Sequence, residues 1–222
     1  MKRNYAIDTA TLPLNHDLIK QVVFHEAGHA AAIHLYNKQK QLPPVPFQII
    51  INNPRPMFGL GQDPDEQVVA MVEGGCLING LPQTLIESAD YYSQEAEDTY
   101  RMAFEADIVN LLVGPLAEAK HIAQRDKQAF EPDKLSPSCL QFFGGQSDLE
   151  KVYEYLGNFI ADTRLHERTI AELFQQALSF IDSPLYWQAI ENLAYHLLDH
   201  SQTTISCDEA IAVLDASVAA PA

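Results

Sequence analysis

Two histidines four residues apart, with a glutamate directly after the first, lie within a stretch of strongly helical periodicity. Over residues 15–36, apolar and histidine side chains recur at steps of three and four residues, which predicts a helix. Each helical residue advances by about 100°, so positions i and i+4 lie about 40° apart on one face. We therefore expect His25 and His29 to project together, with Glu26 on the flank of that face.

The helix carries the pattern HExxH, which is typical of zinc hydrolases. Zinc bound by two imidazoles and one carboxylate keeps an open position and lowers the pKa of bound water toward roughly 7. Glu26 is then the candidate general base, which accepts the proton and passes it to a leaving amine. A random chain of this length shows the pattern at roughly the one per cent level or below, so we interpret it as a metal site rather than as a solvated helix face.

The residues around the histidine pair are small, and the third metal ligand comes from elsewhere in the chain. Small side chains let another element approach the ligands closely, and here they are Ala27, Gly28, Ala30, Ala31 and Ala32. Spacing alone leaves several candidates open for the third ligand, including Glu118, His121 and Asp148.

Two short β-rich runs follow the first helix. Residues 47–53 form a β-branched run flanked by prolines, and residues 67–72 form another before Gly74-Gly75. We predict a small sheet from these runs, with the first helix packed against it. At a sheet edge, either strand could pair with an extended peptide and carry its carbonyl to the metal.

Helical periodicity dominates the rest of the chain. Residues 93–124 form a long helix that Gly114-Pro115 breaks or bends, and residues 126–146 form an irregular connection. The next helix, over 147–162, opens with Ser147-x-x-Glu150, which matches a capping box. Further amphipathic helices are expected near 166–181, 184–200 and 207–216. The predicted fold class is α+β, mainly α, with residues 1–222 as a single domain and a helical C-terminal part over 166–222.

Composition narrows the classes of partner. Thirty acidic against fourteen basic side chains give a net charge of −16, which repels nucleic-acid phosphates and anionic membrane surfaces. Apolar runs such as 108–114 are far shorter than the roughly 20 residues that span a bilayer, and residues 1–8 lack the pattern of a secretory signal. The cysteines, which are Cys76, Cys139 and Cys207, suggest neither a disulfide framework nor a CxxC zinc site. We expect a cytoplasmic protein with no nucleic-acid partner and no membrane insertion.

Three segments resemble, in the same order, those of the FtsH-type AAA zinc metalloproteases. Residues 25–30, His-Glu-Ala-Gly-His-Ala, resemble the active-site helix of that family. Residues 111–118, Leu-Leu-Val-Gly-Pro-Leu-Ala-Glu, are similar to its Leu-Leu-Gly-Gly-Arg-Ala-Ala-Glu helix, although the arginine is missing and Pro115 departs from the pattern. Residues 144–149, Gly-Gly-Gln-Ser-Asp-Leu, resemble its Gly-Ala-Glu-Asn-Asp-Leu segment.

The resemblance implies a third ligand, an activity and a substrate. The aspartate of the family's last segment is its third zinc ligand, so the resemblance favours Asp148. It implies a zinc metallopeptidase that hydrolyses peptide bonds in unfolded or extended polypeptides. No phosphate loop of the form G-x-x-x-x-G-K-S/T occurs in the sequence, so we expect a stand-alone peptidase domain without the family's ATPase module. Such a domain acts on unfolded segments or beside a separately encoded unfoldase. Whether the chain forms a homo-oligomer stays open.

Two other classes of function stay open. One is a catalytically weak or inactive zinc-binding adaptor of the same fold, which the lack of an ATPase favours and the presence of Glu26 disfavours. The other is a hydrolase that acts on a small amide with the same zinc and the same base.

Three further histidines are weaker candidates. His196 and His200 are also four residues apart, but no acid stands where a base should, so we predict a solvated helix edge. His34 is nine residues from His25, about 180° around the helix, and is not expected to share its metal.

Overall fold

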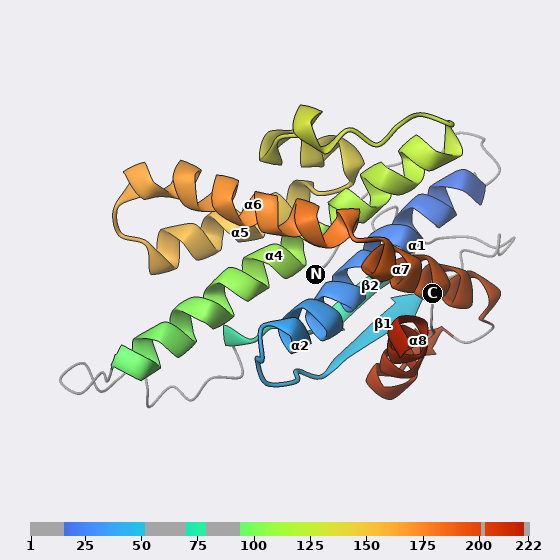
Figure 1. Ribbon diagram of the computed structural model, residues 1–222, viewed down its shortest axis with the longest axis horizontal. Helices are drawn as coiled ribbons and strands as arrows, with labels where there is room; N and C mark the ends of the chain where they lie inside the picture. The colour runs from blue at the N-terminus through green and yellow to red at the C-terminus, as the bar shows by residue number, and fades with distance from the viewer. Residues whose placement is uncertain (1–15, 52–69, 79–93, 201–202, 220–222) are drawn as a thin grey trace, which may run out of the picture.

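A computed structural model describes residues 16–51, 70–78, 94–200 and 203–219 (Figure 1). The described chain is mainly helical with a small antiparallel sheet, which confirms the predicted α+β class. Residues 52–53 and 67–69, which belong to the two predicted strands, lie outside the described residues.

The helix with the histidine pair forms where its periodicity predicts it. Helix α1, His16–Ala31, continues through a π-helical stretch, η1 (Ala32–Tyr36), into the short α2 (Asn37–Gln39). The other long helix of this half, α4, covers Gln94–Arg125 and continues through Pro115. The predicted long helical segment is confirmed, and Gly114-Pro115 does not break it.

The sheet has the strand order β2-β1-β3, and its strands are antiparallel. Strand β1 (Phe47–Ile51) pairs with β2 (Ala70–Gly74) on one side and with β3 (Thr204–Ile205) on the other. Ile49 of β1 faces Val72 in one pairing and Ile205 in the other. Of the two predicted strands, β2 therefore lies at an edge of the described sheet and β1 lies in its centre.

The second half of the chain is helical, as its periodicity predicts. The connection after α4 holds two 3₁₀ helices, η4 (Pro132–Lys134) and η5 (Pro137–Phe143). Each later helix agrees with its predicted range to within a few residues. These helices are α5 (Gln146–Phe159), α6 (His166–Asp182), α7 (Pro184–Asp199) and α8 (Cys207–Ala219). A short 3₁₀ helix that was not predicted, η6 (Thr163–Leu165), precedes α6.

The predicted capping box at the start of α5 is wrong. The N-cap residue is Gly145, no side chain caps the helix, and Ser147 already lies inside the first turn. A β-carbon at Gly145 would come within 2.7 Å of the Pro115 side chain and 2.8 Å of the Leu140 carbonyl oxygen. The start of α5 is therefore set by close packing against α4 and η5 rather than by a serine hydroxyl.

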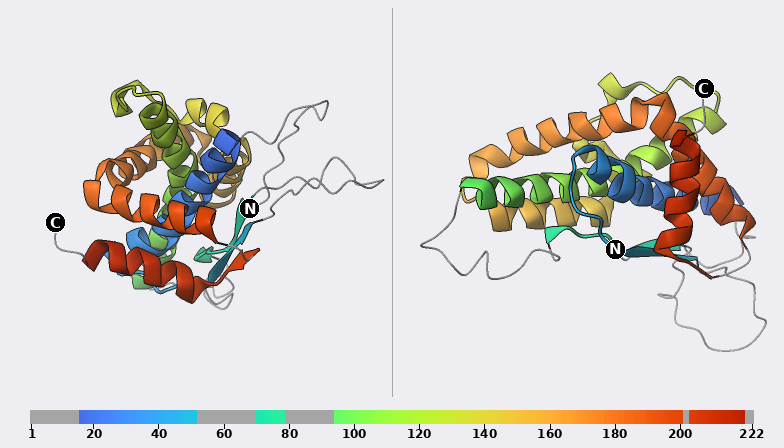
Figure 2. Two further views of the ribbon diagram at one scale, coloured as in Figure 1. Left: turned by 90° about the vertical axis from the view of Figure 1, so that its right-hand side faces the viewer. Right: turned by 60° about the horizontal axis from the view of Figure 1, so that its bottom comes forward.

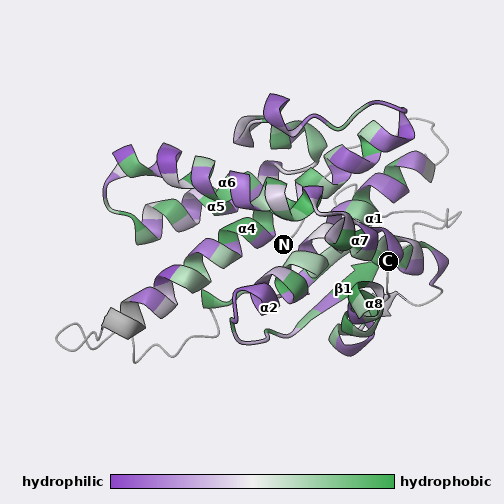
Figure 3. Cartoon of the chain, in the orientation of Figure 1, coloured by the Kyte–Doolittle hydropathy of each residue, from purple (hydrophilic) through white to green (hydrophobic). Residues whose placement is uncertain are grey.

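Helix α1 runs through the middle of the molecule, between α4, α7 and the sheet (Figures 1 and 2). Its small residues permit close packing, because a β-carbon at Gly28 would lie 2.7 Å from the β-carbon of Ala117 on α4. This confirms the expectation of a close approach beside the histidine pair. Figure 3 shows polar residues along the outer turns of α5 and α6 and a mostly hydrophobic β1. In the described ranges, no helix has both the length and the apolar composition needed to cross a bilayer.

Candidate metal centre

Three predicted ligands from two distant segments meet in the interior. Helix α1 supplies His25 and His29, and the first turn of α5 supplies Asp148. Nε2 of His25 lies 3.1 Å from Oδ2 of Asp148, and Nε2 of His29 lies 3.5 Å from Oδ1. The three ligand atoms lie within 4.8 Å of one another. The structure therefore brings together the metal-ligand set that the motif and the resemblance predict.

The donor set and its spacing fit a zinc ion. Tetrahedral zinc with bonds of about 2.0–2.1 Å has ligand atoms about 3.3 Å apart, close to the two separations above. All three side chains are buried, and Nε2 of His29 has no hydrogen-bond partner among the described residues. Buried polar atoms rarely lack a partner, so this nitrogen is available to a metal ion.

The second nitrogen of each ring is held by α4. Nδ1–H of His25 donates to Oε2 of Glu118 at 3.1 Å, and Nδ1–H of His29 donates to the carbonyl oxygen of Asn110 at 2.8 Å. Such bonds fix the tautomer and leave Nε2 of each ring for the metal. Glu118, an open candidate for the third ligand, thus lies behind His25 rather than among the ligand atoms.

His121, the other open candidate, lies away from the ligand group. Its ring stacks on Phe24 at a centroid distance of 3.9 Å. Burial, together with the positive charges of Arg125 and Lys20, lowers the pKa of His121. Among the three candidates that spacing left open, only Asp148 has its carboxylate beside Nε2 of both histidines in the described contacts.

Two adjacent residues of α4 explain how α1 and α5 come together. A β-carbon at Gly114 would overlap the imidazole ring of His29, so the lack of a side chain there makes room for the ligand. The next residue, Pro115, packs against Gly145, the N-cap residue directly before the turn that carries Ser147 and Asp148. The departure from the family pattern at Pro115 is therefore a packing contact at the start of α5.

The histidines govern the charge of Asp148. Burial would raise the pKa of this carboxyl, but the nearby His29 and His25 outweigh burial and hold the pKa well below its usual range. Asp148 is thus an ionised carboxylate inside the protein, as a metal ligand must be.

Glu26, the candidate general base, follows His25 on α1 and reaches the edge of the sheet. Its side chain is buried, and Oε2 accepts a hydrogen bond from the backbone N–H of Val72 at 2.8 Å. This N–H points away from β1. Backbone N–H groups along a strand alternate in direction, and the N–H of Gly75, three residues further on, donates to the carbonyl oxygen of Pro46 on the β1 side. The bond orients the carboxylate and places it beside β2.

A hollow of about 200 Å³ adjoins the centre, with His29 and Val72 in its wall. Besides His29, its polar lining is Cys76, Asp107, Asn110, Lys151 and Tyr155. Asp107 accepts hydrogen bonds from the backbone N–H groups of Leu77 and Ile78 and from the Cys76 thiol, and burial raises the pKa of its carboxyl in spite of them. Sequence reasoning missed this lining because its residues come from α4, from α5 and from the segment that follows β2.

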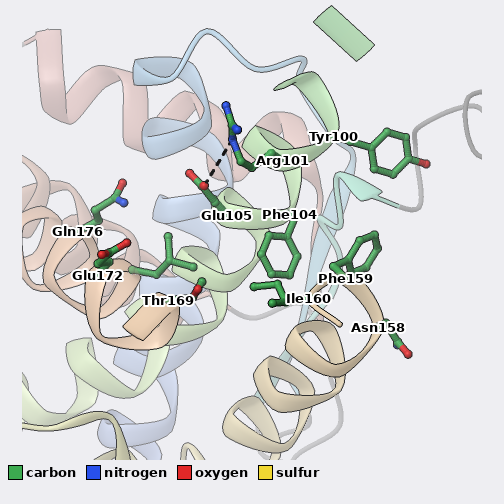
Figure 4. A pocket seen from close by; sticks show the side chains of 11 residues that line it. Tyr100, Arg101, Phe104, Glu105, Asn158, Phe159, Ile160, Thr169, Glu172 and Gln176 are labelled. Carbon is green, nitrogen blue, oxygen red and sulfur yellow. Dashed lines mark ion pairs between the residues drawn. The ribbon is translucent and has the colours of Figure 1, made fainter. Parts of the chain in front are cut away.

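A larger hollow, of about 800 Å³, lies between α4, α6 and the end of α5 (Figure 4). Phe104, Phe159 and Ile160 form an apolar wall, and Arg101 pairs with Glu105 at 4.0 Å near its rim. None of the residues of the metal centre lines it.

The sequence was compared with models of protein families and with curated proteins, and neither comparison found a match. The fold and the site define a mainly helical protein with a buried His-His-Asp cluster and a glutamate next to the first histidine.

Proposed function

We propose that this chain is a zinc metallopeptidase whose metal is bound by His25, His29 and Asp148 and whose general base is Glu26. The observation that carries the proposal is the buried convergence of three ligand atoms, one of them a histidine nitrogen with no hydrogen-bond partner among the described residues. The resemblance of the three motif segments to FtsH-type proteases supports the same assignment.

Each protein group has a distinct role. Zinc in such a set supplies a Lewis acid that polarises a carbonyl and acidifies water. Glu26 accepts the proton of the attacking water and delivers it to the leaving amine. Glu118 and the Asn110 carbonyl hold the two imidazoles in the tautomer that exposes Nε2. A solely structural metal site would gain nothing from Glu26, which favours the hydrolase over the adaptor.

An extended polypeptide is the substrate that best fits the surroundings of Glu26. Strand β2 lies at an edge of the described sheet, and the outward N–H of Val72 contacts the general base. An extended segment beside β2 would bring its scissile carbonyl next to Glu26. The hollow beside His29 would then receive one substrate side chain. Folded proteins cannot offer such a segment, so the chain acts on unfolded regions or with a separate unfoldase.

The proposal is tested with an unfolded substrate such as casein. The zinc-loaded protein should cleave it without ATP, a chelator should abolish cleavage, and added zinc should restore it. Cleavage that persists after complete zinc removal would contradict the proposal. Stoichiometric zinc with no cleavage of casein or of a peptide library would favour the adaptor.

A further inference from the structure

A second group of metal-ligating side chains lies at the C-terminal end of the molecule, where α7 and α8 pack side by side (Figures 1 and 2). His196 lies in the last turn of α7, and His200 directly follows that helix. Glu209 lies in the first turn of α8, with its backbone N–H bonded to Oγ of Ser206. The sequence alone predicted a solvated helix edge here, because the acid comes from the next helix.

The three side chains converge as a ligand set does. Nε2 of His196 lies 2.9 Å from Oε1 of Glu209, and Nδ1 of His200 lies 3.5 Å from the same oxygen. One ligand atom from each residue lies within 4.8 Å of the other two. These separations bracket the value of about 3.3 Å expected between ligand atoms around tetrahedral zinc.

The cluster is half-buried, with exposed side-chain fractions of 34%, 19% and 34% for His196, His200 and Glu209. A site of this kind is open enough for an ion to enter and for water to complete its coordination. It is also formed by two helices whose relative position is already fixed by packing. Little ordering is therefore needed when an ion binds.

His34 and Asp215 form a simple histidine–carboxylate pair elsewhere in the chain. Nε2 of His34 lies 2.8 Å from Oδ1 of Asp215, also on α8, and Lys38 shares that carboxylate at 3.0 Å. A cation already neutralises Asp215, and no second histidine faces it in the described contacts. At Glu209, the place of the lysine is taken by a second imidazole, which is a ligand when neutral.

We propose that His196, His200 and Glu209 form a second divalent-metal site, which binds zinc or another borderline transition metal and joins α7 to α8. Two imidazoles favour this class of ion over Mg²⁺ and Ca²⁺, which prefer oxygen ligands. The site binds more weakly than the buried centre, because water competes at its half-exposed ligands. The site also links the two ends of the connection between α7 and α8. This connection contains β3, which pairs with β1.

The test measures how many metal ions the protein binds and the affinity of each. Protein that holds zinc in the buried centre is titrated with Zn²⁺ by calorimetry, and with Co²⁺ by visible absorption, at low ionic strength. A second equivalent should bind and raise the melting temperature. The double variant His196→Ala/His200→Ala should lose this equivalent and keep the first.

Two further variants keep the test decisive if the double variant folds poorly. Glu209→Gln preserves hydrogen bonding to the histidines but should weaken the second equivalent by about tenfold or more. His34→Ala removes a comparable histidine contact to α8 and should leave both equivalents intact. Binding of only one equivalent by the native protein, or an unchanged second equivalent in Glu209→Gln and in the double variant, would overturn the proposal. Neither result depends on peptidase activity.

Discussion

Glu118 of α4 and His25 of α1 are joined by a 3.1 Å hydrogen bond to Nδ1, while Nε2 of the same ring faces Asp148 at 3.1 Å. One imidazole is therefore held between two carboxylates that have different roles. Glu118 orients the ring, and Asp148 completes the ligand set.

These roles predict different losses of zinc affinity. Removal of a charged ligand in Asp148→Asn should weaken binding by more than about a hundredfold, because only two histidines remain. Glu118→Gln keeps an acceptor for Nδ1–H and should cost at most about 10–100-fold, as is typical of outer hydrogen bonds. Competition with a fluorescent zinc chelator measures both values. Zinc retention by Asp148→Asn together with loss by Glu118→Gln would place the third ligand on α4.

The histidine pair should account for the tightly bound zinc. After dialysis against metal-free buffer, the native protein should hold close to one zinc per chain, and His25→Ala or His29→Ala should hold almost none. His166→Ala is a suitable control, because Nε2 of His166 bonds to the carbonyl oxygen of Ile160 and His166 is not among the clustered ligand residues. Elemental analysis of the four proteins decides the matter, and zinc that survives both ligand substitutions would exclude this centre.

Gly114 should be needed for the metal although it lies within a helix. Gly114→Ala places a methyl group on the His29 ring and should displace it, with loss of zinc affinity. Gly157→Ala in α5 meets no atom within 4 Å and should raise the free energy of unfolding by about 0.5–1 kcal/mol. Zinc binding and denaturant unfolding of both variants test this contrast, which fails if Gly114→Ala binds zinc normally.

The stability of the protein should fall in strong alkali through Tyr36. Burial, and secondarily Glu105, raises the pKa of this phenol from 10.0 to about 12, and its hydroxyl donates to Oε1 of Gln176 at 2.6 Å. The folded state favours the neutral phenol, so its contribution is fully present below pH 10.0 and is lost as the pH rises toward about 12. The stability difference between the native protein and Tyr36→Phe should shrink over this window. A difference that is constant with pH would refute the assignment.

The sequence predicts α1 and its histidine pair well, because both depend on the local 3.6-residue period. Asp148 could not be found from spacing, since its distance from His25 along the chain says nothing of its distance in space, and only the resemblance selected it. Glu118 could not be separated from the ligands without the direction of its side chain. The contact of Glu209 with His196 could not be predicted either, because the two residues lie on different helices. Strand β3 was missed because two residues carry no detectable alternation.

Turnover by Glu26→Gln tests the central claim most directly. The amide oxygen of the variant can still accept the N–H of Val72, so the fold and the zinc content should be preserved. With equal zinc in both proteins, we expect the rate of casein cleavage to fall by about 10² or more, as for the loss of a positioned general base. Equal rates in the native protein and in Glu26→Gln, at equal zinc content, would contradict the account.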